Sequence, residues 1–255
     1  MSHGIAFALG SAAVLGGVVV TVALLVGRGA DRGSGCGAVL IPAYLPPNRI
    51  VDLVRVSPRP RTVVINPHNG PGLQEHEAYR KAVREVQHAG TRVLGYVRTA
   101  YGTRPASEVT GDVDRYRSWY GVDGIFLDEA SPDVSLVPYY AGLARYVRAG
   151  AGRTVVLNPG VVPAREYFGV ADVVVTFEGA AAGYATAASA IPDWLRRERP
   201  DRVAHLIYAA SRDQALSAVG SGAAGYIYAT SGLMPNPWRT LPPYLHEEEA
   251  MAGCR

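Results

Sequence analysis

Eight short runs recur along this chain, and each is continuous in apolar residues rather than alternating with polar ones. They occupy residues 38–45, 62–67, 92–99, 124–130, 154–160, 172–179, 202–211 and 224–232. Strands of a parallel sheet have this pattern, because they are buried on both faces. The runs therefore predict a parallel β-sheet of eight strands.

Helical patterns lie between several of these runs. EHEAYRKAVREVQHAG places Tyr79, Val83 and Val86 on one face and stops at Gly90. LVPYYAGLARYVRAG repeats the pattern up to Gly150, and DQALSAVGSGA is a shorter copy. Strand and helix alternating over eight strands predict an α/β protein with a (β/α)8, or TIM, barrel. A doubly wound open sheet is the alternative, but no GxGxxG follows the first run.

An uncharged apolar segment precedes the runs. Residues 5–27 are long enough, at about 1.5 Å per helical residue, to cross a bilayer core of about 30 Å. We expect an uncleaved signal anchor, a transmembrane helix, with a cleaved signal peptide as the alternative. The chain then divides into residues 1–35, the anchor or signal and a short linker, and residues 36–255, the barrel domain.

Two cysteines, Cys36 and Cys254, flank that domain. The first and last elements of a closed barrel are neighbours, so a Cys36–Cys254 disulfide is one expectation and two unrelated thiols the other. A disulfide would imply an oxidising compartment. Two arginines follow the segment 5–27 and no Lys or Arg precedes it, so the positive-inside rule alone favours a cytoplasmic C-terminus.

The charge pattern and the residue types exclude several functions. The net charge is +3 and no basic run is interleaved with aromatic residues, so we expect no nucleic-acid partner. A Schiff-base aldolase needs a lysine on a strand, and the single lysine, Lys81, falls in a helical pattern. No cluster of histidines ends the strand runs, so we expect no metal.

Polar side chains fall where the strand runs end. They are Tyr44, Asn66, Thr99, Asp128, Glu129, Asn158, Glu178, Ser211 and Thr230. A (β/α)8 barrel builds its active site at the C-terminal ends of its strands. We therefore expect these side chains to line a pocket at the barrel mouth. This explains why the apolar run GIFLDEAS ends in two adjacent acids.

Carboxylates are the strongest chemical signal among them. Asp128, Glu129 and Glu178 end two different strands, and glycoside hydrolysis needs two carboxyl groups on either side of the scissile bond. Tyrosines at the same rim are suited to stacking on sugars: Tyr44, Tyr96, Tyr101, Tyr208, Tyr226 and Tyr228. For Tyr96, Tyr226 and Tyr228, packing in the barrel is the alternative. Asn66 and Asn158 both precede a proline, which holds the backbone extended and the amide at the rim.

Five motifs together resemble the spherulin-4-like family, also called spherulation-specific family 4. They are INPHNGPG (65–72), GYVRTAYGTR (95–104), GVDGIFLDE (121–129), VVLNPG (155–160) and TFEG (176–179), and they span about residues 38 to 232 in the right order. The family includes glycoside hydrolase family 135, whose members are (β/α)8 barrels. These members cleave α-1,4-linked exopolysaccharide containing N-acetylgalactosamine, without a metal or organic cofactor.

The resemblance implies that Asp128, Glu129 and Glu178 correspond to the acidic site residues of the family. The chain departs from the family pattern at two positions, with Arg98 where a histidine often stands and Asn69 where a serine does. Arg98 would bring a cation into the cleft and favour anionic sugars, or it points away.

These observations predict a retaining, endo-acting glycosidase. Asp128 is expected as the nucleophile or as the stabiliser of oxocarbenium charge, and Glu178 as the general acid/base with a raised pKa. Glu129 is expected to bind substrate or to tune its neighbour. The competing assignment makes Glu129 the acid and the substrate N-acetyl group the nucleophile. Adjacent residues of a regular strand point to opposite faces, so Asp128 and Glu129 share the pocket only if the strand ends between them.

Two other classes of function remain as alternatives. One is a non-catalytic barrel that binds polysaccharide at the cell surface, and the other is a structural surface protein. An extracellular glycan requires an extracellular domain, so we expect a single-pass membrane protein with the barrel outside the cell, or a secreted one. This expectation overrides the charge bias around the apolar segment. We expect a monomer.

Overall fold

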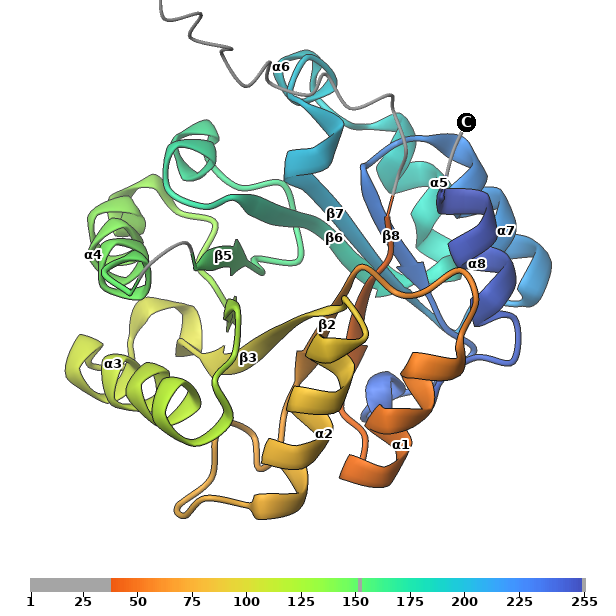
Figure 1. Cartoon of the computed structure of the whole chain (residues 1–255). Coiled ribbons are helices and arrows are strands. Elements are labelled where there is room, and N and C mark those ends of the chain that lie inside the picture. Colours follow the sequence, from red (N-terminus) through yellow and green to blue (C-terminus); the bar gives the residue numbers. More distant parts are fainter. Residues whose placement is uncertain (1–37, 151–152, 254–255) are drawn as a thin grey trace, which may run out of the picture. The chain divides into compact units, whose positions relative to one another are not determined.

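The computed structural model describes residues 38–150 and 153–253 and contains one parallel sheet of eight strands. Each strand pairs with the next one in the chain, in the order β1 to β8 (Figure 1). The strands are β1 (Leu40–Ala43), β2 (Thr62–Ile65), β3 (Arg92–Arg98), β4 (Gly124–Asp128), β5 (Thr154–Leu157), β6 (Val173–Ala180), β7 (Val203–Tyr208) and β8 (Tyr226–Ala229). The eight predicted strands and their parallel arrangement are confirmed.

The sheet is nearly closed into a barrel. Ala38, just before β1, forms a parallel bridge with Tyr226 of β8. Its amide donates to the Gly225 carbonyl at 2.7 Å, and its carbonyl accepts from the Ile227 amide at 3.2 Å. Further along β8 a side chain takes the place of a strand partner, because the Ala229 amide donates to the carboxylate of Glu248 at 3.0 Å. We call this join between β1 and β8 the seam.

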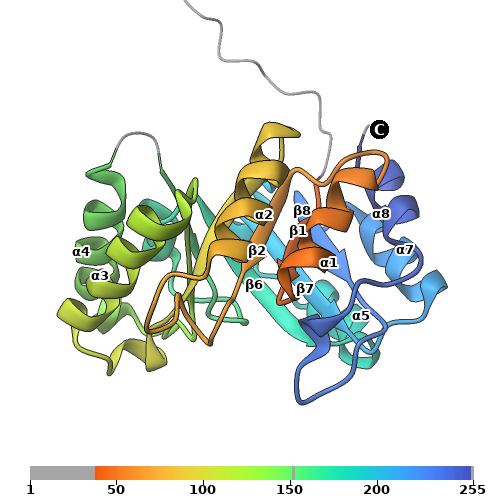
Figure 2. The ribbon, with the colours of Figure 1, turned by 60° about the horizontal axis from the view of Figure 1, so that its bottom comes forward.

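Helices surround the strands (Figures 1 and 2). They are α1 (Pro47–Val51), α2 (Glu77–His88), α3 (Ala106–Arg115), α4 (Val137–Arg148), α5 (Ala181–Ser189), α6 (Asp193–Arg196), α7 (Arg212–Ser221) and α8 (Leu245–Ala252). Helix α2 buries Tyr79, Val83 and Val86, as predicted, and the chain turns at Gly90 with φ +95°.

The connection from β5 to β6 departs from the regular (β/α)8 pattern. Its regular structure is a single 3-10 turn, Arg165–Gly169. Pro159, Gly160 and Pro163 occupy its first half and disfavour a helix there, so too few residues remain for a full α-helix before β6.

The direction of the side chains follows the two-residue period of the strands. A small cavity inside the barrel is lined by Leu40, Thr62, Leu94, Val156, Tyr226 and others, most of them at even-numbered positions. The same face continues towards the C-terminal ends of the strands. There it presents Tyr44, Tyr96, Asp128 and Asn158 to the end of the barrel that we call the mouth.

Some predictions fall outside the described residues. The apolar segment 5–27, Cys36 and Cys254 belong to this part of the chain, so the expected anchor and disulfide stay predictions. Across residues 38–150 and 153–253, no helix is both long enough and apolar enough to cross a membrane.

Candidate active site

Two of the predicted acids share one hydrogen-bond donor at the mouth. Asp128 is the last residue of β4, and Glu178 lies on β6. Between them, Asn158 follows β5 and is 5% exposed. Its Nδ2 donates to Oδ1 of Asp128 at 2.7 Å and to Oε2 of Glu178 at 2.5 Å. The sheet thus brings together residues that lie far apart in the sequence, as predicted from their places at strand ends.

An irregularity in β6 directs Glu178 into the mouth. The pairing of β6 with β7 skips Thr176, because Val175 pairs with Ala204 and Phe177 with His205. Such a bulge reverses the alternation of side chains beyond it. Phe177 consequently packs outside the barrel against Tyr184 of α5, at a ring distance of 5.1 Å, and Glu178 faces inwards.

The backbone of Glu129 explains how two consecutive acids reach the same pocket. Strand β4 ends at Asp128, and Glu129 has φ +48°, in the left-handed region that non-glycine residues seldom adopt. The regular alternation of β4 therefore stops between the two residues. The condition stated from the sequence, that the strand must end there, is met.

Burial and a neighbouring charge raise the pKa of Glu178 to about 7. Burial has the larger effect, and the negative charge of Asp128 adds to it. Hydrogen bonds from Asn158 and from the Trp238 side chain act in the opposite direction. A carboxyl group with this pKa is partly protonated at neutral pH, as a general acid requires.

Asp128 has more donors directed at it. Burial raises its pKa, but hydrogen bonds from the Tyr96 hydroxyl, the Asn158 amide and the Glu129 backbone N–H favour the charged form. These donors favour the charged form of Asp128 more than the donors around Glu178 favour that of Glu178. Tyr44 stands against Tyr96, with ring centroids 5.5 Å apart. Burial raises the pKa of Tyr44, and the charges of Asp128 and Glu178 add to this effect.

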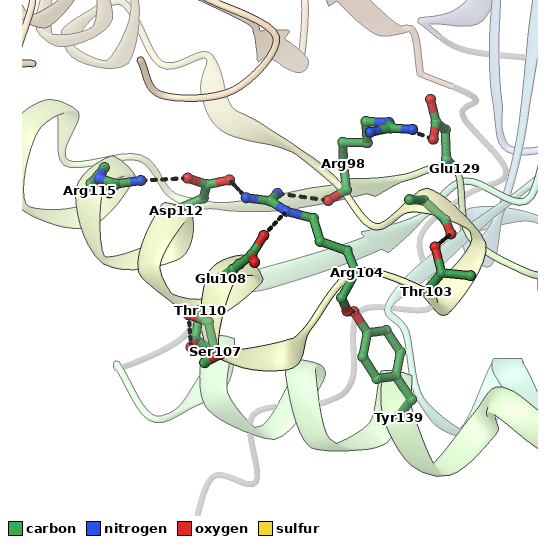
Figure 3. A network of polar contacts seen from close by, with 11 residues as sticks. Arg98, Thr103, Arg104, Ser107, Glu108, Thr110, Asp112, Arg115, Glu129 and Tyr139 are labelled. Atoms are coloured by element: carbon green, nitrogen blue, oxygen red, sulfur yellow. Dashed lines mark hydrogen bonds and ion pairs between the residues drawn. The ribbon is translucent and has the colours of Figure 1, made fainter. Parts of the chain in front are cut away.

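The third acid pairs with a cation at the rim. Nε of Arg98, at the end of β3, donates to Oε2 of Glu129 at 2.7 Å (Figure 3). Both side chains are partly exposed, 46% for Arg98 and 30% for Glu129. Behind them Arg104 donates to the Arg98 carbonyl at 3.0 Å and pairs with Asp112 of α3 at 2.7 Å. Arg98 therefore lies at the anchored end of β3 beside a catalytic candidate and does not point away.

Four other predicted residues lie at or near the mouth. Asn66 is half-buried and its Oδ1 accepts from the Gly70 amide at 2.8 Å, so it also shapes its own loop. Asn69 is exposed with φ +49°, and Tyr101 is 59% exposed with φ +54°. Tyr208 ends β7, half-buried, with its ring centroid 6.4 Å from that of Trp238.

Two predicted substrate-binding residues are fully buried, so their assignment is corrected. The Thr99 hydroxyl donates to the backbone carbonyls of Asp128 and Glu129, at 2.9 and 2.8 Å, behind the pocket. Tyr228 packs beneath Trp238, with ring centroids 5.9 Å apart. Neither side chain is exposed, so neither can contact a glycan. The sequence pattern assigned both residues to the correct strand runs. It did not predict how deeply they are buried, because the loops that cover them have no regular pattern.

Trp238 was missed by the sequence analysis. It lies in a short 3-10 turn of the β8–α8 connection, is 6% exposed, and donates a side-chain hydrogen bond to Glu178. Its backbone carbonyl also accepts from the Tyr44 amide at 3.2 Å. The loop after the last strand also lies at the mouth, so the presence of a tryptophan in that loop was the one sequence signal that could have indicated it.

The described residues contain no group of three or more His, Cys, Asp or Glu side chains that could hold a metal ion. The site is thus built of paired carboxylates, amides and aromatic rings.

Comparison with known proteins identifies the family. The model of spherulation-specific family 4 matches residues 38–251. The chain belongs to this family. It is also 30% identical to spherulin-4 of Physarum polycephalum over 226 residues, which cover 82% of this chain and 68% of that protein.

Solved structures share the barrel. Sph3 of Aspergillus clavatus, crystallised in complex with N-acetylgalactosamine, matches with a TM-score of 0.73 and 25% identity, over 86% of this chain and 99% of that one. The maltogenic α-amylase AmyB of Thermotoga neapolitana matches with a TM-score of 0.54 over 84% of this chain and 75% of its own. At 10% identity this second match concerns the fold alone.

Proposed function

We propose that this protein is a retaining, endo-acting glycosidase whose substrate is an exopolysaccharide containing α-1,4-linked galactosamine or N-acetylgalactosamine. The observation that carries the proposal is the Asp128–Asn158–Glu178 bridge at the barrel mouth. The similarity to Sph3, a protein solved with bound N-acetylgalactosamine, supports the choice of sugar.

The spacing of the two carboxyl groups favours direct attack over inversion. Both bonded oxygens lie within 2.7 Å of the same Asn158 nitrogen. They are therefore at most about 5 Å apart, near the ~5–5.5 Å of retaining enzymes and below the ~6.5 Å that an inverting enzyme needs to hold a water molecule.

The two acids then take different roles. Asp128, whose charged form is favoured by three hydrogen bonds, attacks the anomeric carbon or stabilises positive charge there. Glu178, with a pKa of about 7, protonates the leaving oxygen and later accepts a proton from water. The first step deprotonates Glu178 and the second reprotonates it, so the cycle closes without another proton carrier.

Glu129 and Arg98 would bind substrate in this scheme. Their ion pair presents an acceptor and donors side by side at the rim, a combination suited to sugar hydroxyl and amide groups. The carboxylate of Glu129 is occupied by Arg98, whereas that of Glu178 is buried beside Asp128, so Glu178 is the better acid.

The test is release of reducing ends by the purified full-length protein from partially deacetylated α-1,4-galactosamine polymer, beside other microbial exopolysaccharides. We expect release of internal fragments that keep their anomeric configuration in proton NMR. Binding without release from any of the polymers would replace the hydrolase by a polysaccharide-binding barrel.

The substrate also requires a location outside the cell, by a membrane anchor or by secretion. A reporter enzyme fused to the C-terminus tests this, since alkaline phosphatase is active only outside the cytoplasm. If a second reporter that works only in the cytoplasm is active when fused at the same position, the location outside the cell and the proposed substrate are both contradicted.

A further inference from the structure

A buried chain of hydroxyl groups lies behind the two consecutive acids. The Ser131 amide donates to the Tyr140 hydroxyl at 2.8 Å, and that hydroxyl lies 3.1 Å from Oγ1 of Thr99. Thr99 in turn donates to the carbonyls of Asp128 and Glu129. Thr99 and Tyr140 are each 0% exposed. The single proton of each hydroxyl therefore has an assigned acceptor, with Tyr140 donating to Thr99 and Thr99 sharing its proton between two carbonyls.

The carbonyls that Thr99 holds belong to the residues with the unusual geometry. A backbone with φ +48° costs on the order of 1 kcal/mol or more for a side chain such as that of Glu129, so it persists only where surrounding contacts fix it. The backbone amides of Thr99 and Tyr101 donate to the same two carbonyls, at 2.9 and 2.6 Å. All of these contacts come from the β3–α3 connection and α4, away from the open side of the pocket.

We propose that Thr99 and Tyr140 are positioning residues whose hydroxyl groups fix the left-handed backbone of Glu129, so that the carboxylates of Asp128 and Glu129 both face the mouth. The consequence for catalysis rests on the proposed glycosidase function. The consequence for geometry does not, because it concerns the free protein.

One contact makes the inference measurable. The backbone N–H of Glu129 donates to the Asp128 carboxylate and lowers its pKa, against the larger effect of burial, which raises it. Loosening the Glu129 backbone withdraws this donor. The other titratable or charged groups around Asp128 are Tyr96 and Arg98 of β3, Tyr44 after β1, Glu178 of β6 and the Glu129 carboxylate. The charge of Glu129 raises the pKa of Asp128 by less than its backbone N–H lowers it, so the loss of the N–H decides the direction.

The experiment compares Thr99→Val, which keeps the shape and removes the hydroxyl, with Thr99→Ser, which keeps the hydroxyl. Carboxyl-carbon NMR of the full-length protein follows the titration of Asp128, assigned from the signal lost in Asp128→Asn. We expect a higher midpoint in Thr99→Val and an unchanged one in Thr99→Ser. Thr110→Val is the matched control, because it removes a hydroxyl that bonds only to the Ser107 carbonyl within α3.

Kinetics on the released-fragment assay give the second readout. A misplaced reacting group costs up to about 100-fold, so we expect kcat of Thr99→Val to fall about 10- to 100-fold with KM changed less than about 3-fold. Thr99→Ser should stay within about 3-fold of the wild type. If the wild type hydrolyses no glycan, the proposed function fails, and the titration still decides the positioning role.

A second variant covers a failure of Thr99→Val to fold. Tyr140→Phe keeps the ring and removes the proton that reaches Thr99, and it should raise the Asp128 midpoint in the same direction. An Asp128 midpoint equal to that of the wild type in folded Thr99→Val, or in Tyr140→Phe where Thr99→Val does not fold, would overturn the inference.

Discussion

Two pairs of acids lie in different parts of this barrel, a half-buried pair at the mouth and a buried pair at the seam, and the comparison separates chemistry from packing. At the mouth, Asp128 and Glu178 share the Asn158 amide and receive further donors from Tyr96 and Trp238. At the seam, Glu248 of α8 accepts from β8, and its neighbour Glu249 is buried beside it. Burial raises the pKa of Glu248 to about 9 and that of Glu249 to about 8.

The seam pair has few partners. Glu248 accepts from the Ala229 amide, while its Oε2 and Oε1 of Glu249 are buried with no hydrogen-bond partner among the described residues. Both acids are therefore neutral at pH 7. A raised pKa alone does not mark an active site, since burial is enough to produce it. The mouth differs because its two acids share one donor, receive further donors unequally, and lie within reach of solvent.

The sharpest test of this distinction removes one proton-carrying acid from each pair. Glu178→Gln should lower kcat about 1,000-fold, since general acid–base catalysis contributes roughly 10²–10⁴. Glu248→Gln, the matched control, keeps an acceptor for the Ala229 amide and should leave kcat within about 3-fold. Reducing-end release at saturating substrate measures both. Similar losses in the two variants would show that the mouth pair has no special role.

The seam should instead dominate the pH dependence of stability. An acid whose pKa is higher in the folded state than its ordinary 4.5 stabilises the fold below pH 4.5, and this contribution is lost as the pH rises towards 9. Glu248→Gln cannot ionise, so we expect it to be more stable than the wild type by on the order of 3 kcal/mol at pH 8, and similar to it at pH 4. Urea unfolding at the two pH values measures the difference. A constant difference across this range would contradict the assignment of a neutral Glu248.

The donor shared at the mouth should have an intermediate effect. Asn158→Ala removes a hydrogen bond that lowers the pKa of Glu178, so the decline of kcat/KM on the alkaline side should move above pH 7. Loss of one donor at a developing charge costs about 100- to 1,000-fold, and we expect a fall in kcat near the lower end of this range. The pH–rate profile of the variant measures both effects. An alkaline limb that stays in place would mean that Glu178 is not the acid.

Trp238→Phe should have the smallest effect. It keeps the ring against Tyr208 and Tyr228 and removes only the N–H directed at Glu178. We expect the alkaline limb to rise by less than about one pH unit and kcat to fall about 2- to 5-fold, since one neutral hydrogen bond contributes about 1 kcal/mol. Phe168→Leu, at a buried aromatic contact with Trp194 outside the mouth, controls for the loss of ring packing. An identical pH profile in Trp238→Phe would remove Trp238 from the site.

The sequence predicted the mouth better than the seam. Continuous apolar runs indicate strands that are buried on both faces. The pattern therefore predicted the eight strands and the polar residues at their ends. The acids of HEEEAMA look like the solvated face of a terminal helix. Only the gap between β1 and β8 brings Glu248 to an unpaired amide, and no local pattern encodes such a gap.

Long loops account for the other differences. Trp238 reaches the mouth from a connection of many residues, and its position depends on tertiary packing rather than on strand period. Thr99 ends a strand run, as a substrate-binding residue would, but the turn at Ala100 and Tyr101, both with positive φ, closes over it. The absence of an α-helix between β5 and β6 is easier to infer from the sequence, because two prolines and a glycine interrupt that segment.

The bulge in β6 has a consequence for how chains of this plan diverge. Thr176 is the extra residue, so its deletion would remove the bulge and leave Val175, Phe177 and Glu178 opposite Ala204, His205 and Leu206. Glu178 would then still face Asp128. In barrels of this kind, a one-residue gap at this point of the sixth strand is therefore compatible with an intact pair of acids, whereas replacement of the acid itself is not.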